Sequence, residues 1–182
     1  MAQAAIFWLT GLSGAGKTTL AEAVRARLAA EGRRVLILDG DQVREAFHRD
    51  LGFTPEDIRE NNRLIAELCD RNRAAYDAIL VPVISPFRDA RSAVRRRLAP
   101  GFYEVHVRAS LETVEARDVK GLYAKARRGE VGGMIGQSGG VPYEPPEQPE
   151  IAIDTATEPK ADSIARLLAF IRTRLAGPAE AT

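Results

Sequence analysis

Short apolar runs alternate along the chain with longer segments in which apolar positions recur at helical spacing. Ala5–Thr10 is almost continuously apolar, which is typical of a strand covered on both faces of a sheet. Lys17–Glu31 follows with apolar residues at steps of four. This spacing predicts a helix that ends before Gly32, because glycine is favoured at helix C-termini. The chain is therefore predicted to open with a strand, a loop and a helix.

The same alternation continues to the end of the chain. The predicted strands are Val35–Leu38, Ile79–Ile84, Tyr103–Val107 and Ile151–Ile153, and the predicted helices are Arg59–Tyr76, Val94–Leu98 and Ala161–Leu175. This order favours an α/β fold, a three-layer sandwich with a mostly parallel sheet of about five strands. Ligands bind such folds at the carboxyl ends of the strands, where Asp39, Asp41 and Ser85 are expected.

One long segment, Asp118–Pro149, breaks the alternation. It is rich in charged residues, glycine and proline, including the pairs Gly132–Gly133 and Gly139–Gly140, and it has little apolar periodicity. A stretch of this length inside a compact domain is more often a functional lid than a plain connection. We expect residues 118–149 to form a lid within a single domain that spans residues 1–182.

Composition and charge narrow the class of partner. The 182 residues carry 26 Lys and Arg against 25 Asp and Glu, so no overall field favours a nucleic acid or an anionic membrane. No apolar run approaches the roughly 20 residues that span a bilayer. The single cysteine, Cys69, cannot form an intramolecular disulfide and is typical of a reduced compartment. We expect a cytoplasmic protein that binds a small molecule.

Residues Gly11–Thr18 carry the clearest chemistry. They fit the pattern G-x-x-x-x-G-K-[ST], directly after a predicted strand and directly before a predicted helix. Backbone N–H groups of such a loop surround phosphate oxygens, which indicates a site for a nucleoside triphosphate such as ATP. We expect Lys17 to reach the terminal phosphates and Thr18 to ligate Mg²⁺. The loop residues are Gly11, Leu12, Ser13, Gly14, Ala15, Gly16, Lys17 and Thr18.

Asp41 and Arg44 follow the second predicted strand, beside this loop. A carboxylate there can orient an attacking hydroxyl or take its proton, as in small-molecule kinases. Alternatively, Asp39 or Asp41 caps the turn that begins near Val43, and the two roles are compatible. Arg44 either pairs with an anionic acceptor or is a plain surface arginine.

Six motifs occur in order along the chain. They begin at Gly11, Leu38, Arg49, Ile84, Ala116 and Pro142, and they are GLSGAGKT, LDGDQVR, RDLGF, ISPFR, ARDVKGLY and PYEPP. The first motif is shared by many nucleotide enzymes, whereas DGD, ISPFR and KGLY in this order are much more specific. From about Phe7 to Thr155 the chain resembles the adenylyl-sulfate kinases, which have the P-loop kinase fold.

The resemblance implies an activity and a set of site residues. The family transfers the γ-phosphate of ATP, with magnesium, to the ribose 3′-hydroxyl of adenylyl sulfate, giving 3′-phosphoadenylyl sulfate. Lys17, Asp41 and Ser85 are then the catalytic candidates. The implied acceptor residues are Asp41, Arg44, Phe53, which would stack on adenine, Asn61, Ile84 and Ser85, and Arg117, Lys120 and Leu122 would reach over the nucleotide from the lid.

Ser85 has two possible roles. In the family the matching serine has been described as a phosphorylated intermediate. We favour direct in-line transfer from ATP to the acceptor. A magnesium-bound γ-phosphate beside a positioned hydroxyl needs positioning and charge stabilisation more than it needs a covalent phosphoserine intermediate. Members of the family commonly form dimers, so a homodimer is also implied.

Two departures from the family pattern affect the acceptor side. The family has an arginine where this chain has Ile58, and Arg59 comes one residue later, a rotation of about 100° on a helix. In the lid, residues 132–141 are longer than the family's run by about two residues, and Met134 replaces an aromatic residue. Methionine can still pack on a purine, but ordering the lid glycines costs about 1 kcal/mol each.

These departures predict weaker or altered acceptor binding. A kinase of a different small hydroxyl compound is the first alternative, and a regulatory nucleotide-binding protein without phosphoryl transfer is the second. The presence of Lys17, Thr18, Asp41 and Ser85 argues against the second alternative.

Other charged and polar residues are given structural interpretations. Arg91 and Arg95–Arg97 are assigned to a solvated helix face because acidic residues flank them and the net charge is +1. His48 and His106 lack metal-ligand spacing. Asp154 either lies near the adenine or caps the following turn.

Overall fold

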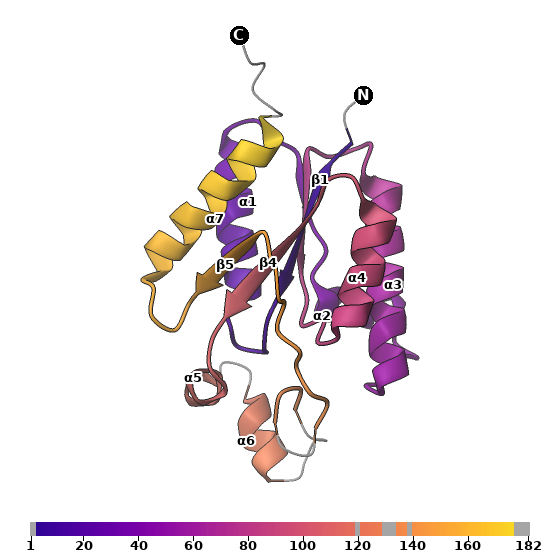
Figure 1. Cartoon of the computed structure of the whole chain (residues 1–182), viewed down its shortest axis with the longest axis vertical. Helices are drawn as coiled ribbons and strands as arrows, with labels where there is room; N and C mark the ends of the chain where they lie inside the picture. The colour runs from indigo at the N-terminus through magenta and orange to yellow at the C-terminus, as the bar shows by residue number, and fades with distance from the viewer. Residues whose placement is uncertain (1–2, 119–120, 129–133, 138–139, 177–182) are drawn as a thin grey trace.

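The structure, a computed structural model, describes residues 3–118, 121–128, 134–137 and 140–176. Its strands form one parallel sheet in the order β2-β3-β1-β4-β5 (Figure 1). Leu9 of β1 pairs with Pro82 of β3 and Val105 of β4, so the carboxyl ends of these strands lie at one edge. The strands are β1 (Ala5–Thr10), β2 (Val35–Ile37), β3 (Ala78–Pro82), β4 (Phe102–Arg108) and β5 (Ile151–Asp154).

Helices cover both faces of this sheet. In Figure 1, α1 and α7 lie on one side, and α3 and α4 lie on the other. The predicted α/β sandwich with a parallel sheet is confirmed. The helices are α1 (Lys17–Ala30), α2 (Gly40–Phe47), α3 (Pro55–Asn72), α4 (Arg88–Leu98), α5 (Leu111–Arg117), α6 (Leu122–Arg127) and α7 (Lys160–Leu175).

The two layers of core explain why β1 is apolar almost throughout. Phe7 and Leu9 belong to the cluster packed with α1 and α7, whereas Ile6 and Trp8 belong to the cluster with α3 and α4. All four side chains are fully buried, because alternate residues of a strand point to opposite faces and helices cover both. This arrangement holds the loop that follows β1 rigidly at the edge of the sheet.

Helix α3 begins at Pro55 rather than at the predicted Arg59, and it ends at Asn72 rather than at Tyr76. The cause of the earlier start is a capping box, in which the Thr54 hydroxyl accepts from the Asp57 amide and the Asp57 carboxylate accepts from the Thr54 amide. Proline at the first helical position adds to it. Ile58 is therefore helical, and the one-residue displacement of Arg59 is a true rotation about the helix axis.

Two short helices, α5 and α6, were not predicted, and α6 lies inside the expected lid segment. Ser110 caps α5 by accepting from the Thr113 amide at 3.1 Å. The Asp118 carboxylate accepts from the backbone amides of Tyr123 and Ala124, at 3.0 and 2.9 Å, and so organises the start of α6. Helices of this length have too few turns to produce a clear apolar period.

Some predicted lid residues lie outside the described residues, namely Lys120, Gly132, Gly133 and Gly139. Among the residues that are described, no helix is both long enough and apolar enough to cross a membrane.

Candidate active site

The phosphate loop, residues Gly11–Thr18, joins β1 to α1 in the predicted position. Gly14 and Gly16 have φ values of 80° and 92°, which only glycine adopts at little cost. Leu12 and Ala15 close a turn in this loop, with the Ala15 amide donating to the Leu12 carbonyl at 3.2 Å. The loop therefore leads directly into the N-terminus of α1, where backbone N–H groups and the helix dipole favour anions.

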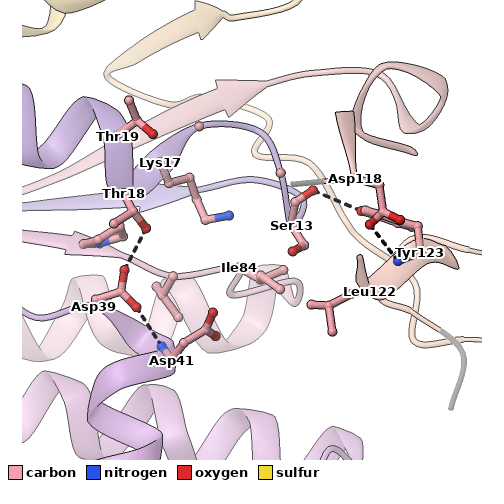
Figure 2. A pocket seen from close by; sticks show the side chains of 14 residues that line it. Ser13, Lys17, Thr18, Thr19, Asp39, Asp41, Ile84, Asp118, Leu122 and Tyr123 are labelled. Atoms are coloured by element: carbon pink, nitrogen blue, oxygen red, sulfur yellow. Dashed lines mark hydrogen bonds between the residues drawn. The ribbon is translucent and has the colours of Figure 1, made fainter. Parts of the chain in front are cut away.

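The Lys17 ammonium lies across the phosphate loop and is largely buried, with the residue 8% exposed. Its Nζ donates to the carbonyl oxygens of Gly11 and Leu12, at 2.9 and 2.8 Å. Figure 2 shows the side chain extended into the pocket beside Thr18. A cation in this position is close to where the loop would hold phosphate oxygens.

Asp39 connects the phosphate loop to the acceptor side. The Thr18 hydroxyl donates to Asp39 Oδ2 at 2.7 Å, and Asp39 Oδ1 accepts from the amides of Asp41 and Gln42 at 3.0 and 3.4 Å (Figure 2). Asp39 is thus the N-cap of α2, and the cap role left open between Asp39 and Asp41 belongs to Asp39. Sequence reasoning did not assign the contact with Thr18, although a P-loop hydroxyl normally has an acidic partner.

A cavity of about 140 Å³ lies between the phosphate loop, the start of α2, the end of β3 and the start of α6 (Figure 2). It brings together several residues predicted from the sequence with others that were not. The lining residues are Ser13, Gly14, Gly16, Lys17, Thr18, Thr19, Asp39, Asp41, Pro82, Val83, Ile84, Asp118, Leu122 and Tyr123. Nucleotide-side and acceptor-side candidates therefore meet in one pocket.

Arg44 and Phe53 lie outside this cavity and contact each other. Arg44 Nη1 donates to the carbonyls of Leu51 and Gly52 at 3.1 and 2.6 Å, and its guanidinium lies 4.7 Å from the centre of the Phe53 ring. Burial lowers the pKa of Arg44, an effect that Asp41 opposes. Phe53 is 72% exposed, so one face of its ring is available to a planar ligand.

Asn61 and Ser85 are both buried. Asn61 Oδ1 lies 2.9 Å from His48 Nδ1, which links α3 to the end of α2. The Ser85 hydroxyl accepts from Asn62 Nδ2 at 2.8 Å, and Ser85 is 1% exposed. Ile84 lines the cavity, and Ser85 is not among the lining residues.

The first part of the proposed lid segment contacts the phosphate loop. The Tyr123 hydroxyl donates to the Ser13 carbonyl at 3.0 Å, and burial raises the pKa of Tyr123 to about 12. Arg117 Nη2 donates to the Thr155 carbonyl at 2.5 Å. The Thr155 hydroxyl in turn donates to the Ala15 carbonyl at 2.8 Å. The contacts of Tyr123 and Thr155 with the phosphate loop were not predicted from the sequence.

Further along the lid segment, the neighbouring residues Met134 and Ile135 pack against different clusters. Ile135 packs with Ile58, Phe87 and Ala90, whereas Met134 packs against the main core. Gly136 approaches the phosphate loop so closely that an added Cβ would stand 2.7 Å from Leu12 Cδ2. The segment therefore bridges the phosphate loop and the α3–α4 pair.

Both of the positions that depart from the family pattern have a structural role here. Ile58 is 4% exposed and takes part in this apolar contact with the lid segment. Arg59 points to the surface, where it pairs with Asp89 at 3.1 Å and stacks on Phe87 at 4.2 Å. The expectation that Arg59 is rotated away from the cavity agrees with its absence from the lining residues.

The prediction that Arg91 lies on a solvated face is wrong. Arg91 is 3% exposed, and its Nε donates to Glu104 Oε1 at 2.6 Å. Arg91 and Glu104 are oppositely charged partners on α4 and β4, and pairing makes the burial of both tolerable.

Asp154 caps its own turn, with Oδ1 accepting from the Ala156 amide at 3.0 Å.

This fold and site define a P-loop phosphotransferase. A phosphate-binding loop joins β1 of a parallel sheet to its helix. An acidic residue, Asp39, follows β2, two positions from β1 in the sheet order, and accepts a hydrogen bond from the loop's threonine. That combination serves phosphoryl transfer, in which positioning and charge stabilisation do most of the work.

Comparison with known proteins identifies the family. The profile of the adenylylsulphate kinase family matches residues 3–154. The adenylyl-sulfate kinase of Paraburkholderia xenovorans is 44% identical over 172 residues, which are 94% of this chain and 95% of that protein. That of Burkholderia ambifaria is 46% identical over 164 residues, 90% of each chain. The chain therefore belongs to the adenylylsulphate kinase family.

A solved structure supports the same family and fold. The Mycobacterium tuberculosis APS kinase CysC, in complex with AMPPNP and APS, superposes with a TM-score of 0.89 at 32% identity, covering 94% of this chain and 99% of that one. The predicted family and fold are thus confirmed.

Proposed function

We propose that this protein transfers the γ-phosphate of ATP to the 3′-hydroxyl of adenylyl sulfate, giving 3′-phosphoadenylyl sulfate and ADP. Membership of the family supports the reaction, and the relatives named above carry this activity in their names. The observation that carries the proposal is the shared cavity, in which Lys17 and Thr18 of the phosphate loop lie together with Asp41 and Ile84 of the acceptor side.

Magnesium fits the oxygen atoms at the end of β2. The Thr18 hydroxyl and the Asp39 carboxylate are 2.7 Å apart, and Mg²⁺ prefers such hard oxygen ligands. The described residues contain no group of three or more His, Cys, Asp or Glu that could hold a metal alone. Nucleotide phosphates and water would therefore complete the coordination, as is usual in P-loop enzymes. Held there, magnesium would supply positive charge that offsets the negative charge of the nucleotide phosphates.

Asp41 is proposed to orient the acceptor hydroxyl and to take its proton. Because Asp39 supplies the cap of α2, Asp41 is not needed in that role. Asp41 lines the cavity together with Lys17, and Lys17 would stabilise the charge on the transferred group. A positioned general base contributes about 10²–10⁴ to a rate.

Direct in-line transfer is proposed in preference to a phosphoserine intermediate. The hydroxyl of Ser85 is buried and bonded to Asn62 Nδ2 at 2.8 Å, whereas Asp41 and Ile84 line the cavity. Ser85→Ala is therefore expected to retain phosphoryl transfer. Complete loss of transfer in this variant, together with a trapped phosphoserine in the wild type, would refute the direct route.

On the remaining candidate residues, Arg44 is proposed to hold Phe53 against the adenine of adenylyl sulfate, and Asn61 to shape the same pocket through His48. Leu122 is proposed to contact the nucleotide from the lid segment, residues 118–149, and Arg117 from the end of α5, directly before that segment. Lys120, outside the described residues, keeps the role that the resemblance implies.

The decisive experiment is an ADP-release assay with ATP and Mg²⁺ in which adenylyl sulfate is compared with other nucleosides, sugars and amino alcohols. The product from adenylyl sulfate is identified by mass. Asp41→Asn is expected to lower kcat by about 10²-fold or more. Glu45→Gln, an exposed carboxylate one turn later on α2 and outside the cavity, is the matched control and should keep wild-type activity. No turnover of adenylyl sulfate would refute the proposal.

A kinase for a different hydroxyl-bearing acceptor is the second candidate. The burial of Ile58 against the lid segment favours it, because the family's arginine at this position is absent and an anionic acceptor loses a partner. Turnover of another acceptor in the same screen, with none of adenylyl sulfate, would support it. A homodimer and a cytoplasmic location stay predictions, which light scattering and cell fractionation would test.

A further inference from the structure

A buried polar cluster lies beneath the turn formed by Ile84 and Ser85. Thr10 and Arg91 are 0% and 3% exposed, and Glu104, their neighbour on β4, is 8% exposed. Burying polar groups is costly unless each finds a partner. In this cluster the donors converge on the backbone of one turn, the turn whose first residue lines the cavity.

Arg91 is the centre of the cluster. Besides the bond of Nε to Glu104, Nη1 donates to the Ser85 carbonyl and Nη2 to the Glu144 carbonyl, both at 2.7 Å. The planar guanidinium thus joins α4 and β4 to the Ile84–Ser85 turn and to the strap. We define the strap as residues 142–150, the last part of the lid segment together with Glu150, directly before β5. A lysine has no such rigid fork of donors.

The turn is held from the sheet side as well. The Thr10 hydroxyl lies 2.6 Å from the Ile84 carbonyl and 3.3 Å from the Ser85 carbonyl, and 3.1 Å from the Tyr143 hydroxyl of the strap. Ser85 has a φ of 45°, in the left-handed region that non-glycine residues rarely occupy. Such a conformation persists only where surrounding contacts over-determine it, and it is most often found at functional sites.

The strap is also bonded directly to the residues that follow the turn. The Glu144 amide donates to the Pro86 carbonyl at 2.9 Å, and the Glu144 carboxylate accepts from the Arg88 amide at 2.8 Å. Arg91 binds the Glu144 carbonyl on the same stretch. A displacement of the strap would therefore be transmitted to the turn through Arg91.

We propose that Arg91 is a positioning residue for phosphoryl transfer: through the Ser85 and Glu144 carbonyls it sets the Ile84–Ser85 wall of the acceptor site and couples that wall to the strap. Glu104 balances its charge. The inference rests on the proposed function, since it concerns the acceptor that the wall contacts. Loss of Arg91 therefore affects the acceptor and leaves ATP binding at the phosphate loop unchanged.

The test separates positioning from general stability. Arg91→Met alone leaves the buried Glu104 carboxylate with only the 3.4 Å contact to Arg95, and it is expected to be unstable. The double variant Arg91→Met/Glu104→Leu removes both charges and should melt near the wild-type temperature. Arg95→Met is the control. Arg95 lies on the same helix and contacts Glu104 at 3.4 Å and Glu150, the last residue of the strap, at 2.5 Å. Among the described residues it has no hydrogen bond to the turn, and without it the Glu150 carboxylate still accepts from the Glu104 amide.

Steady-state kinetics are then measured for adenylyl sulfate and for ATP. In the double variant and in Arg91→Lys, kcat/KM for adenylyl sulfate is expected to fall about tenfold to a hundredfold, the value of a hydrogen bond from a charged donor. KM for ATP should stay within about twofold of wild type, and Arg95→Met should match wild type in both. Normal acceptor kinetics in the double variant, or an equal rise in KM for ATP, would overturn the inference.

Hydrogen exchange of the peptide that covers residues 82–88 gives an independent measurement. The amides of Ile84 and Ser85 are expected to exchange faster in the double variant and at the wild-type rate in Arg95→Met. Failure of the wild type to phosphorylate adenylyl sulfate would refute the proposed function, and the exchange data would still decide the role of Arg91. Unchanged exchange in the double variant counts against positioning.

Discussion

Asp39 offers a sharp test of the site, because its two carboxylate oxygens have separate partners. Oδ1 accepts from the Asp41 amide at 3.0 Å as the cap of α2, and Oδ2 accepts from the Thr18 hydroxyl at 2.7 Å. In Asp39→Asn the amide oxygen must keep the cap, because the amides at the helix start need an acceptor. The NH₂ group then faces Thr18 and the expected magnesium position, so the negative charge is lost there and a hydrogen-bond donor replaces the acceptor.

The two effects have different magnitudes. Asparagine caps helices about as well as aspartate, so the free energy of unfolding should fall by only about 0.3–1 kcal/mol, the value of an anion at a helix N-terminus. Loss of a preorganised electrostatic partner in a phosphoryl-transfer site should lower kcat/KM by about 10²–10³. The concentration of Mg²⁺ required for half-maximal rate should rise as well.

The assay is a magnesium titration of the kinase rate, paired with urea unfolding. Asp77→Asn is the matched control, since Asp77 Oδ2 accepts from the Arg34 amide at 2.7 Å at the opposite end of the sheet. It should change stability slightly and the rate not at all. A kcat/KM for Asp39→Asn within about tenfold of wild type at every Mg²⁺ concentration would refute the role of Asp39 at the metal.

Three further predictions concern titration, reactivity and the lid. Burial and the charge of Arg108 lower the pKa of His106 from 6.5 to about 4 in the folded protein. Between these two pH values the unfolded chain therefore binds the imidazole proton more tightly than the folded chain does. About 1–2 kcal/mol of stability, after discounting for solvent, should be present above pH 6.5 and lost as the pH falls toward 4; urea unfolding of His106→Gln should show a flatter pH dependence. Burial raises the pKa of Cys69 to about 12, so a thiol reagent at about pH 8 should label it only on unfolding. Tyr123→Phe loses the bond to the Ser13 carbonyl and should raise KM for ATP about threefold to tenfold, measured at saturating acceptor.

Each of these predictions has a clear contrary result. An identical pH dependence of unfolding in wild type and His106→Gln would show that the histidine is not the titrating group. Rapid labelling of Cys69 in the native protein would contradict its burial. An unchanged KM for ATP in Tyr123→Phe would separate the start of α6 from nucleotide binding.

Local patterns predicted the parts of the site that depend on neighbouring residues. The phosphate loop is a contiguous motif, and β1 is apolar on both faces, so each is visible within a short window of sequence. The contact between Thr18 and Asp39 joins residues 21 positions apart through the pairing of strands. It could be anticipated only by asking which carboxylate the sheet brings beside the threonine.

Arg91 was misassigned for a related reason. A run of arginines with acidic neighbours is usually solvated, and the deciding partner, Glu104, lies on β4 in another layer of the fold. The short helices α5 and α6 escaped notice because their order comes from capping by Ser110 and Asp118 and not from an apolar period. Residues whose roles depend on contacts between layers are therefore those that sequence patterns miss.

Glycines in a loop segment are usually taken to make the backbone flexible. Gly136 of the lid segment instead allows close packing against the phosphate loop. Its φ of 90° and its approach to Leu12 make it a fitted surface against the phosphate loop. Engineering for heat resistance often replaces loop glycines with alanine to restrict the unfolded chain. At Gly136 that exchange would introduce backbone strain and push the lid away from the loop, so a library built for thermostability should hold this position fixed.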